Sequence, residues 1–181
     1  MSRTSRLDQI DLHEVFISAL PDVVISHGDL AVKPLEIDLK PPLPQKIRLY
    51  LYNATKPPGG RTLGEHKIQL IVPGQGRGHR GSFDHSGGRI VLLVGYQPEA
   101  EVFIFWDAGL YPDFAYSSNL QVRAETVYAA LAGEIATQKR RIRGEGGKGV
   151  QVETVITSRP ERLAEAIQQR MDVTLQRLLG Q

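Results

Sequence analysis

"RIVLLVGYQPEAEVFIFWDA", residues 89–108, consists of two apolar runs on either side of a short turn that contains proline. Both runs are rich in β-branched and aromatic residues, which favour strands over helices. No helical segment separates the two runs, so the two strands are predicted to pair in an antiparallel manner. This stretch therefore predicts a sheet whose strands follow one another directly along the chain.

Other segments extend this sheet on both sides of the opening stretch. Residues 46–55 and 65–72 have the same strand character and no helix connects them, so neighbouring strands are predicted to be antiparallel. Later in the chain, residues 120–124 form a possible strand and residues 149–157 alternate apolar with polar side chains. Residues 30–39 also alternate, but Pro34 interrupts them and a proline-rich linker follows at 40–45. The sheet is therefore expected to start after residue 45.

Three segments carry apolar residues at helical spacing. The first is residues 7–20, which Pro21 ends, and the second is residues 125–135. The last is about residues 159–179, where Ser158 and Glu161 are predicted to form a capping box. Its single apolar stripe consists of Leu163, Ile167, Met171, Leu175 and Leu178.

Together these segments predict an α+β fold, in which a curled, mostly antiparallel β pseudobarrel is flanked by an N-terminal and a C-terminal helix. A chain of 181 residues suits a single domain, residues 1–181. Within it we expect a helix and an extended linker over residues 1–45, the β pseudobarrel core over residues 46–157, and the C-terminal helix over residues 158–181.

The composition excludes several kinds of chemistry. The chain has no cysteine, which excludes disulfides, thiolate catalysis and cysteine-ligated zinc. No Gly-Lys-Ser/Thr phosphate loop and no Gly-x-Ser-x-Gly nucleophile motif occur, and we expect no cofactor. No apolar run approaches the roughly 20 residues of a membrane span. We therefore expect a cytoplasmic protein with no membrane partner.

A glycine-rich loop, "PGQGRGHRGSFDHSGG" at residues 73–88, contains the pattern G-x-G-x-x-G. A dinucleotide site needs a helix directly after such glycines, and here another strand follows, so the match is interpreted as accidental. His79, Asp84 and His85 are suitable metal ligands in type, but their spacing is not diagnostic of a metal site. We expect the loop to be mobile without DNA and ordered on it.

Positive charge is concentrated in two segments, although the formal net charge of the chain is only +2. Residues 46–89 hold eight Lys or Arg against two acids, and residues 138–148 hold five against one. Such clusters are suited to the phosphates of double-stranded DNA, although solvated loops on an ordinary surface would also carry them. The candidate DNA-binding residues are Arg61, Lys67, Arg77, His79, Arg80, Lys139, Arg140, Arg141 and Arg143.

Two alternatives to DNA binding stay open. Glu65 and Lys67 have the Glu-x-Lys form in which a carboxylate holds Mg²⁺ and a lysine orients water, as in Mg²⁺-dependent nucleases. That chemistry needs a second carboxylate, and Asp38 and Asp107 are poorly placed to supply it. The second alternative is a noncatalytic assembly subunit, whose C-terminal helix would dock a partner through the Leu163 to Leu178 stripe.

A polar and aromatic stretch at residues 106–121 predicts a pocket that could stack on a flipped base and read its hydrogen-bonding edge. The candidate pocket residues are Trp106, Asp107, Tyr111, Tyr116, Ser118 and Gln121. Packing in the core would explain the aromatic residues of the preceding strand, Trp106 included, equally well.

An ordered series of motifs across about residues 48–125 carries a resemblance to a known family. The series is "RLYLYNATKPPGGR", "GEHKIQLIVPGQ", "IVLLVGY", "VFIFWDA" and "YSSNLQVRAE". It resembles the recognition domains attached to bacterial restriction systems, particularly modification-dependent restriction endonucleases that carry HNH nuclease domains or are partnered with McrB-type motors.

The resemblance implies a PUA-like fold or DNA-binding pseudobarrel whose loops enter the grooves of DNA, and some relatives read methylated cytosine. The residues to which it points are Arg61, Glu65, Gln69, Trp106, Asp107, Ser118 and Gln121. The chain departs from that family because it contains no HNH block, GTPase motif or other nuclease signature. We therefore expect a recognition module rather than an enzyme, with cleavage by a separate nuclease or motor subunit or by a domain outside this sequence.

Overall fold

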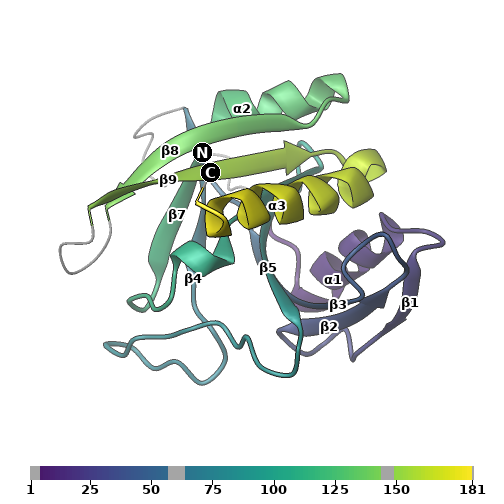
Figure 1. Cartoon of the computed structure of the whole chain (residues 1–181), viewed down its shortest axis with the longest axis horizontal. Helices are drawn as coiled ribbons and strands as arrows, with labels where there is room; N and C mark the ends of the chain where they lie inside the picture. Colours follow the sequence, from purple (N-terminus) through teal and green to yellow (C-terminus); the bar gives the residue numbers. More distant parts are fainter. Residues whose placement is uncertain (1–4, 57–63, 144–148, 181) are drawn as a thin grey trace.

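The computed structural model describes residues 5–56, 64–143 and 149–180. Within these ranges it contains a seven-stranded sheet, a two-stranded sheet and three α-helices (Figure 1). The elements are α1 (Gln9–Ser18), β1 (Val24–His27), β2 (Leu35–Leu39), β3 (Lys46–Asn53), β4 (Glu65–Leu70), β5 (Ile90–Gln97), β6 (Val102–Trp106), β7 (Ser118–Arg123), α2 (Ala124–Ala129), β8 (Ala136–Arg143), β9 (Val150–Ser158) and α3 (Leu163–Leu178), with 3-10 turns η2 (Ala108–Leu110), η3 (Ala130–Ala132) and η5 (Pro160–Arg162). None of these helices is both long and apolar enough to cross a membrane.

The large sheet has the strand order β1-β2-β3-β5-β6-β9-β8. β5 and β6 pair in an antiparallel manner, which confirms the prediction from residues 89–108. The sheet is mostly antiparallel, as predicted, but the neighbouring strands β3 and β5 are parallel. The reason is that β4 does not join this sheet but pairs with β7, so the chain makes a long excursion between β3 and β5.

The prediction that the sheet starts after residue 45 is wrong, because β1 and β2 belong to it. Pro34 lies just before β2 and does not interrupt it. The α+β class and the mostly antiparallel pairing agree with the sequence. The sheet ends in β1 on one edge and β8 on the other, and these edges do not pair, so it is not a closed barrel. The pseudobarrel and PUA-like predictions are therefore not confirmed.

Two hydrophobic cores lie on opposite faces of the large sheet. Within β6, Phe103 and Phe105 point into the first core and Ile104 and Trp106 into the second, as expected for a strand covered on both faces. Helices α1 and α3 close the first core with Leu12, Phe16, Leu163 and Ile167. The β4–β7 sheet and α2 close the second with Ile68, Leu70, Leu120, Val122 and Val127.

The C-terminal helix differs from its prediction at its start and along its apolar stripe. The chain enters it through the 3-10 turn η5. The predicted capping box does not form, because the buried Ser158 hydroxyl has no hydrogen-bond partner among the described residues and Glu161 pairs with Arg159. Leu163 and Ile167 of the stripe are buried, whereas Leu175 and Leu178 are exposed. Met171 and Val173 are partly buried against the first core, so only the end of α3 beyond them leaves its apolar side chains exposed.

Candidate nucleic-acid interface

The two-stranded sheet of β4 and β7, here called the ribbon, presents a row of polar side chains outward. This row consists of three of the six cross-strand pairs of the ribbon: Glu65 with Arg123, Lys67 with Gln121, and Gln69 with Asn119. The residues between them, His66, Ile68, Leu70, Leu120 and Val122, are buried. This strict alternation follows from the period of two in a strand, and it leaves one whole face of the ribbon polar.

Several of the site residues predicted from the sequence lie on the ribbon. Lys67, Gln69 and Gln121 share its outer face, and Glu65 lies at its end opposite Arg123. Ser118 pairs with Leu70 at the other end, and its hydroxyl donates to the carbonyl oxygen of Ala115 at 2.9 Å. Glu65 and Lys67 are thus on one face, but the described part of the chain contains no group of three or more His, Asp or Glu side chains that could hold a metal ion.

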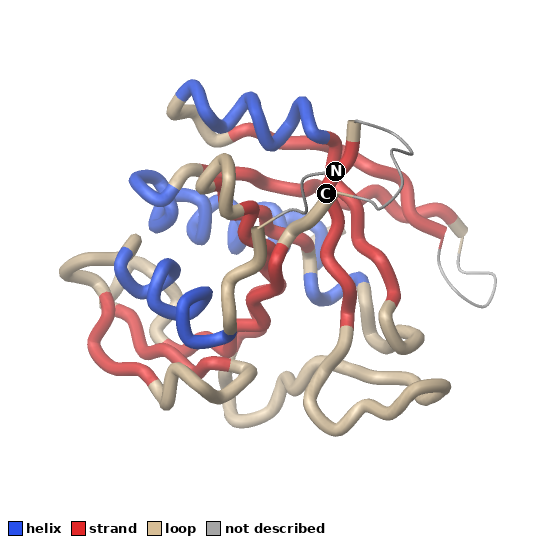
Figure 2. The backbone as a smooth tube through the Cα atoms, turned by 180° about the vertical axis from the view of Figure 1, so that it is seen from behind, coloured by secondary structure: helices blue, strands red, loops and turns tan. Residues whose placement is uncertain are grey.

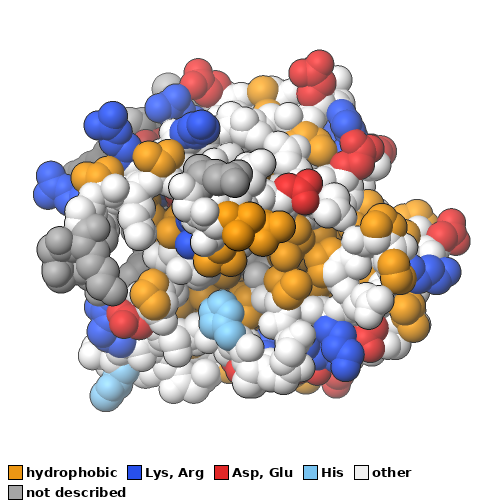
Figure 3. Space-filling view, viewed as in Figure 1, with side chains coloured by type: hydrophobic (Ala, Val, Ile, Leu, Met, Phe, Trp, Pro, Cys, Tyr) orange, Lys and Arg blue, Asp and Glu red, His pale blue; other side chains and the backbone are white. Residues whose placement is uncertain are grey.

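The hairpin of β8 and β9 carries a second set of predicted residues. Lys139, Arg141 and Arg143 alternate along the exposed face of β8, and we call these three the basic row. Val150 and Val152 lie opposite Arg143 and Arg141 on β9 and are 61% and 54% exposed, so none of the described elements covers this face of the hairpin. Lys and Arg side chains gather over β8 in the space-filling view (Figure 3).

Arg140 is on the other face of β8 from the basic row. Its guanidinium donates to the backbone oxygen of Gln121 on the ribbon, and its Nε is 3.6 Å from a carboxylate oxygen of Glu153. The side chain of Gln138, on the same face, accepts from the backbone N–H of Arg123 at 2.8 Å. These contacts attach the hairpin to the ribbon, and both views show the two at the same end of the molecule (Figure 1; Figure 2). Arg140 therefore joins elements rather than extending the basic row.

The glycine-rich loop, residues 73–88, is attached to the rest of the fold at several points. Gly81 forms a β-bridge with Phe114, and the Phe83 ring packs between Tyr50 and Phe114 with centroids 4.8 and 4.9 Å away. A Cβ atom at Gly81 would lie 2.5 Å from the Gln75 side-chain amide, which would have to move away from its hydrogen bonds with the Val72 N–H and the His79 oxygen. These contacts attach the loop to the fold, and the expectation that it is mobile without DNA and ordered on it stays a prediction.

The cations of this loop have different surroundings. Arg80 pairs with Asp113, so part of its charge is already balanced. Arg77 and His79 lie on the exposed part of the loop. Arg48, which is buried beneath the loop, donates to the carbonyl oxygens of Asp84 and Ser86 and pairs with Glu36. Arg77 and His79 are therefore the loop residues best placed to meet a ligand.

The predicted base pocket is not assembled as one open site. Trp106 is buried in the second core, and its indole N–H donates to the backbone oxygen of Gln121. The Asp107 carboxylate is also buried and accepts from Arg177 at 2.6 and 3.1 Å. The hydroxyl of Tyr111 donates to buried Glu153. Tyr116 and Ser118 are half-buried, and Gln121 lies on the outer face of the ribbon.

Asp107, Tyr111 and Glu153 belong to a buried polar network that reaches helix α3. Arg170, which is 3% exposed, lies with Nη2 3.6 Å from Asp107 Oδ2, and its Nη1 donates to the backbone oxygen of Thr154. Burial raises the pKa of the Glu153 carboxyl and of the Tyr111 hydroxyl, and burial lowers the pKa of the Arg170 guanidinium. The network therefore fastens α3 to the end of β6 through charged groups.

The sequence reasoning missed Arg123 of the ribbon. Its signal was the alternation over residues 118–123, which pairs in register with residues 65–70. It also missed a cavity beside Gln69, lined by Arg6 and Lys33 among others, for which no local pattern exists. Arg61 was a predicted DNA-binding residue, and it lies outside the described residues.

Comparison with known proteins yields one match. A protein-family model described as methylase-associated X1 matches residues 45–167. The matched segment contains the ribbon, the glycine-rich loop, the β8–β9 hairpin and the start of α3. No curated protein and no solved structure matches the chain.

Proposed function

Because the chain belongs to the methylase-associated X1 family, we propose that it is a DNA-recognition subunit of a restriction-modification system. The description of the family supports this setting, since methylases are the modifying enzymes of such systems. The observation that carries DNA recognition is the outer face of the ribbon, where Lys67, Gln69, Asn119, Gln121 and Arg123 are aligned. In this proposal the ribbon reads bases and the surrounding cations bind phosphates.

The ribbon has the shape and chemistry that base reading requires. A two-stranded antiparallel ribbon fits the major groove of B-DNA, where each base pair presents its own pattern of donors and acceptors. Gln and Asn side chains can form two hydrogen bonds with one adenine, and Lys and Arg side chains can form two with one guanine. Gln121 and Lys67 are directly opposite one another, so a single base step can meet both.

The basic row supplies the phosphate contacts in this proposal. Lys139, Arg141 and Arg143 follow one exposed strand, and alternate residues of a strand are about 6.6 Å apart, close to the spacing of phosphates along one DNA strand. Arg77 and His79 of the glycine-rich loop extend the positive surface. Arg80 and Arg140 have protein partners and serve mainly to hold the loop and the hairpin in place.

Replacing Gln121 with alanine tests the reading of bases. We expect this change to weaken binding to the preferred duplex about 10- to 100-fold, because one base-edge contact contributes about 1–3 kcal/mol of discrimination. Binding to unrelated duplexes should change less, since phosphate contacts are retained. Gel shifts with unmodified and cytosine-methylated duplexes of several sequences measure both quantities and show whether the preferred base is a modified cytosine.

The matched control is Gln176→Ala, which removes the same side chain from the exposed face of α3. It should leave the affinity unchanged for every duplex. Equal weakening of all duplexes by Gln121→Ala would contradict a role in reading bases and would leave the ribbon with phosphate contacts only. Unchanged affinity for every duplex would remove the ribbon from the interface.

A second candidate function, assembly with another subunit, is favoured by the exposed end of α3. Leu175, Leu178 and Leu179 are 55%, 68% and 65% exposed, and apolar side chains gather near the C-terminus in Figure 3. A nuclease, motor or methylase subunit could cover them. We expect Leu175→Asp to abolish co-purification with such a subunit while Gln176→Ala retains it, and equal recovery of the two variants would contradict this role.

A further inference from the structure

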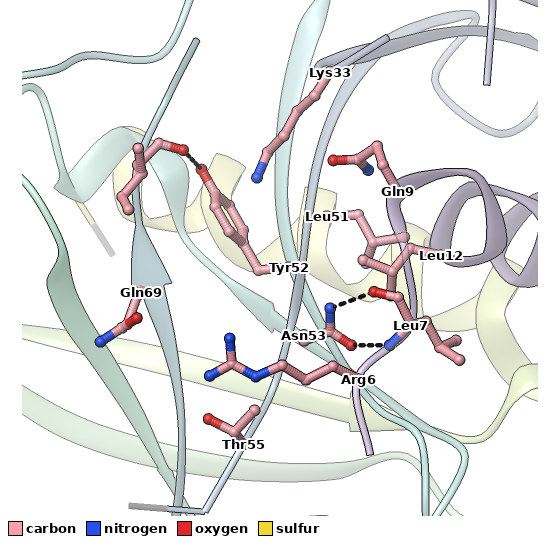
Figure 4. A pocket seen from close by; sticks show the side chains of 11 residues that line it. Arg6, Leu7, Gln9, Leu12, Lys33, Leu51, Tyr52, Asn53, Thr55 and Gln69 are labelled. Carbon is pink, nitrogen blue, oxygen red and sulfur yellow. Dashed lines mark hydrogen bonds between the residues drawn. The ribbon is translucent and has the colours of Figure 1, made fainter. Parts of the chain in front are cut away.

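A cavity of about 330 Å³ lies between four parts of the chain: helix α1, the segment that precedes β2, strand β3 and strand β4 (Figure 4). Gln69 of the ribbon is one of its lining residues. Leu7, Leu12, Leu51 and Ile71 contribute the apolar part of the cavity wall. The polar lining consists of Arg6, Gln9, Lys33, Tyr52, Asn53, Thr55 and Gln69. Its volume is at the lower end of the range of about 300–1,000 Å³ for small-molecule sites.

The charge of this cavity is positive. Arg6 and Lys33 line it, and among the described residues no Asp or Glu does. In Figure 4 the Arg6 guanidinium reaches toward Thr55 and Gln69, and the Lys33 ammonium group lies above the Tyr52 ring, 3.2 Å from the centroid. Two cations without a carboxylate in the described lining favour an anionic ligand, because the negative charge of the ligand would balance them.

Lys33 is held in an environment that disfavours its own charge. Burial lowers its pKa to about 7, since the ammonium group is largely removed from water and lies over the face of the Tyr52 ring. An anion in the cavity would stabilise the charged form. The lysine is therefore positioned as a binding group, whereas a lysine with only a structural role would ordinarily have a carboxylate partner.

Some polar side chains of the lining already form hydrogen bonds within the protein, and others are available to bind a ligand. The Asn53 amide is fully engaged, since it donates to the Leu7 oxygen and accepts from the Leu7 N–H, both at 2.9 Å. The Gln9 amide nitrogen, Nε2, is hydrogen-bonded to Nε2 of the His13 ring at 2.9 Å. For Gln69 and for the Thr55 hydroxyl, the described part of the chain shows no side-chain hydrogen bond, so both are available to a ligand.

We propose that this cavity binds a nucleoside monophosphate group, with its phosphate between Arg6 and Lys33 and its base and sugar against the apolar wall and Gln69. A lone inorganic anion is far smaller than the cavity, and a purely apolar ligand would leave two cations without a partner. A nucleotide combines one charged end, a largely apolar ring face and a hydrogen-bonding edge, which corresponds to the three parts of the lining.

The nucleotide can come from two sources. One is a free mononucleotide. The other is a nucleotide flipped out of a duplex that lies along the ribbon, because Gln69 belongs both to the ribbon and to the cavity wall. Only the second source depends on the function proposed above, and the experiments below separate the two.

The first experiment titrates the whole chain with the four deoxynucleoside 5′-monophosphates, the matching nucleosides and inorganic phosphate by calorimetry. We expect at least one monophosphate to bind about ten-fold or more tightly than its nucleoside and than inorganic phosphate. Arg6→Gln and Lys33→Met should each weaken that binding about ten-fold, whereas Lys40→Met, at an exposed lysine distant from the cavity, should not. Arg6 is exposed, so its variant tests the cavity even if Lys33→Met folds poorly.

The pH dependence distinguishes Lys33 from its neighbours. Between pH 7 and pH 9 a phosphate monoester is already dianionic, since its second pKa is about 6. His13 faces Lys33, and burial lowers its pKa, whereas burial raises the pKa of Tyr52, so both stay neutral over this range. Arg6 stays charged. Binding should therefore weaken at least about five-fold from pH 7 to pH 9, and Lys33→Met should remove this dependence.

The second experiment uses a duplex with 2-aminopurine at a mismatched position, whose fluorescence rises when the base leaves the stack. A rise that Lys33→Met abolishes, without loss of duplex affinity, assigns the cavity to a flipped nucleotide. If the duplex does not bind at all, the proposed function fails and the mononucleotide titration alone decides the inference. If no monophosphate binds more tightly than its nucleoside and no Lys33-dependent rise occurs, the inference is overturned even when the duplex binds.

Discussion

Replacing Lys139, Arg141 and Arg143 with glutamine is expected to weaken binding to a DNA duplex about 10- to 100-fold at ~0.1 M salt, because each phosphate contact releases counterions from the DNA. The three side chains lie on an exposed strand face, so their removal should leave the fold intact. The slope of log affinity against log salt should become shallower by about 2.7, at about 0.9 for each lost contact. Fluorescence anisotropy over a salt series measures both.

The control for the basic row is Lys40→Gln with Lys46→Gln, which removes two exposed charges at the β2–β3 end of the sheet. If net charge alone governed binding, this control would produce about two-thirds of the loss seen with the basic row. We expect less than about a two-fold change from it. A basic-row variant that binds as tightly as the unaltered chain, with the same slope, would show that the hairpin does not contact DNA.

Replacing Asp107 with alanine is expected to lower the free energy of unfolding by about 3–5 kcal/mol, the usual cost of removing one partner from a buried ion pair. The Asp107 side chain is 4% exposed and accepts from Arg177 and from the Gly109 N–H, and Arg170 is 3.6 Å away. Without the carboxylate, Arg170 would be a buried charge with no nearby counterion except Glu153. Urea denaturation followed by tryptophan fluorescence measures the loss.

Two comparisons isolate the charge of Asp107. Asp107→Asn keeps the shape of the side chain and should show most of the loss. Asp113→Ala removes a carboxylate that is 52% exposed and pairs with Arg80 at the surface, so it should cost less than about 1 kcal/mol. A loss of similar size from Asp113→Ala and Asp107→Ala would mean that burial of the Asp107 network contributes nothing to stability.

The parts of the fold that depend on local pattern could be predicted from the sequence. The β5–β6 pair was predictable because the two strands are adjacent in the chain and joined by a short turn. The parallel pairing of β3 with β5 could not be predicted, because nothing local shows that β4 pairs with β7, which lies about fifty residues later. β2 was missed because Pro34 was assigned to the interior of a strand, whereas it lies at the residue before the strand starts.

The same limit applies to the candidate site. The charge of the β8 segment was visible in the sequence, but which arginines are exposed depends on the register of β8 with β9, which places Arg140 opposite Glu153 and Arg141 opposite Val152. Trp106 is the last residue of β6 and Asp107 follows it. The ribbon packs over Trp106, and α3 covers Asp107 through Arg177. Burial of that kind depends on tertiary packing, and no residue pattern within 106–121 indicates it.

The measurement that tests the central proposal most directly is the affinity of the unaltered chain for a short duplex between ~50 mM and ~200 mM salt. We predict binding at the lower salt and a log–log slope of about −3 or steeper, because the basic row and the exposed loop cations meet at least three or four phosphates. No binding at ~50 mM salt, or an affinity that does not change with salt, would contradict DNA recognition by this chain.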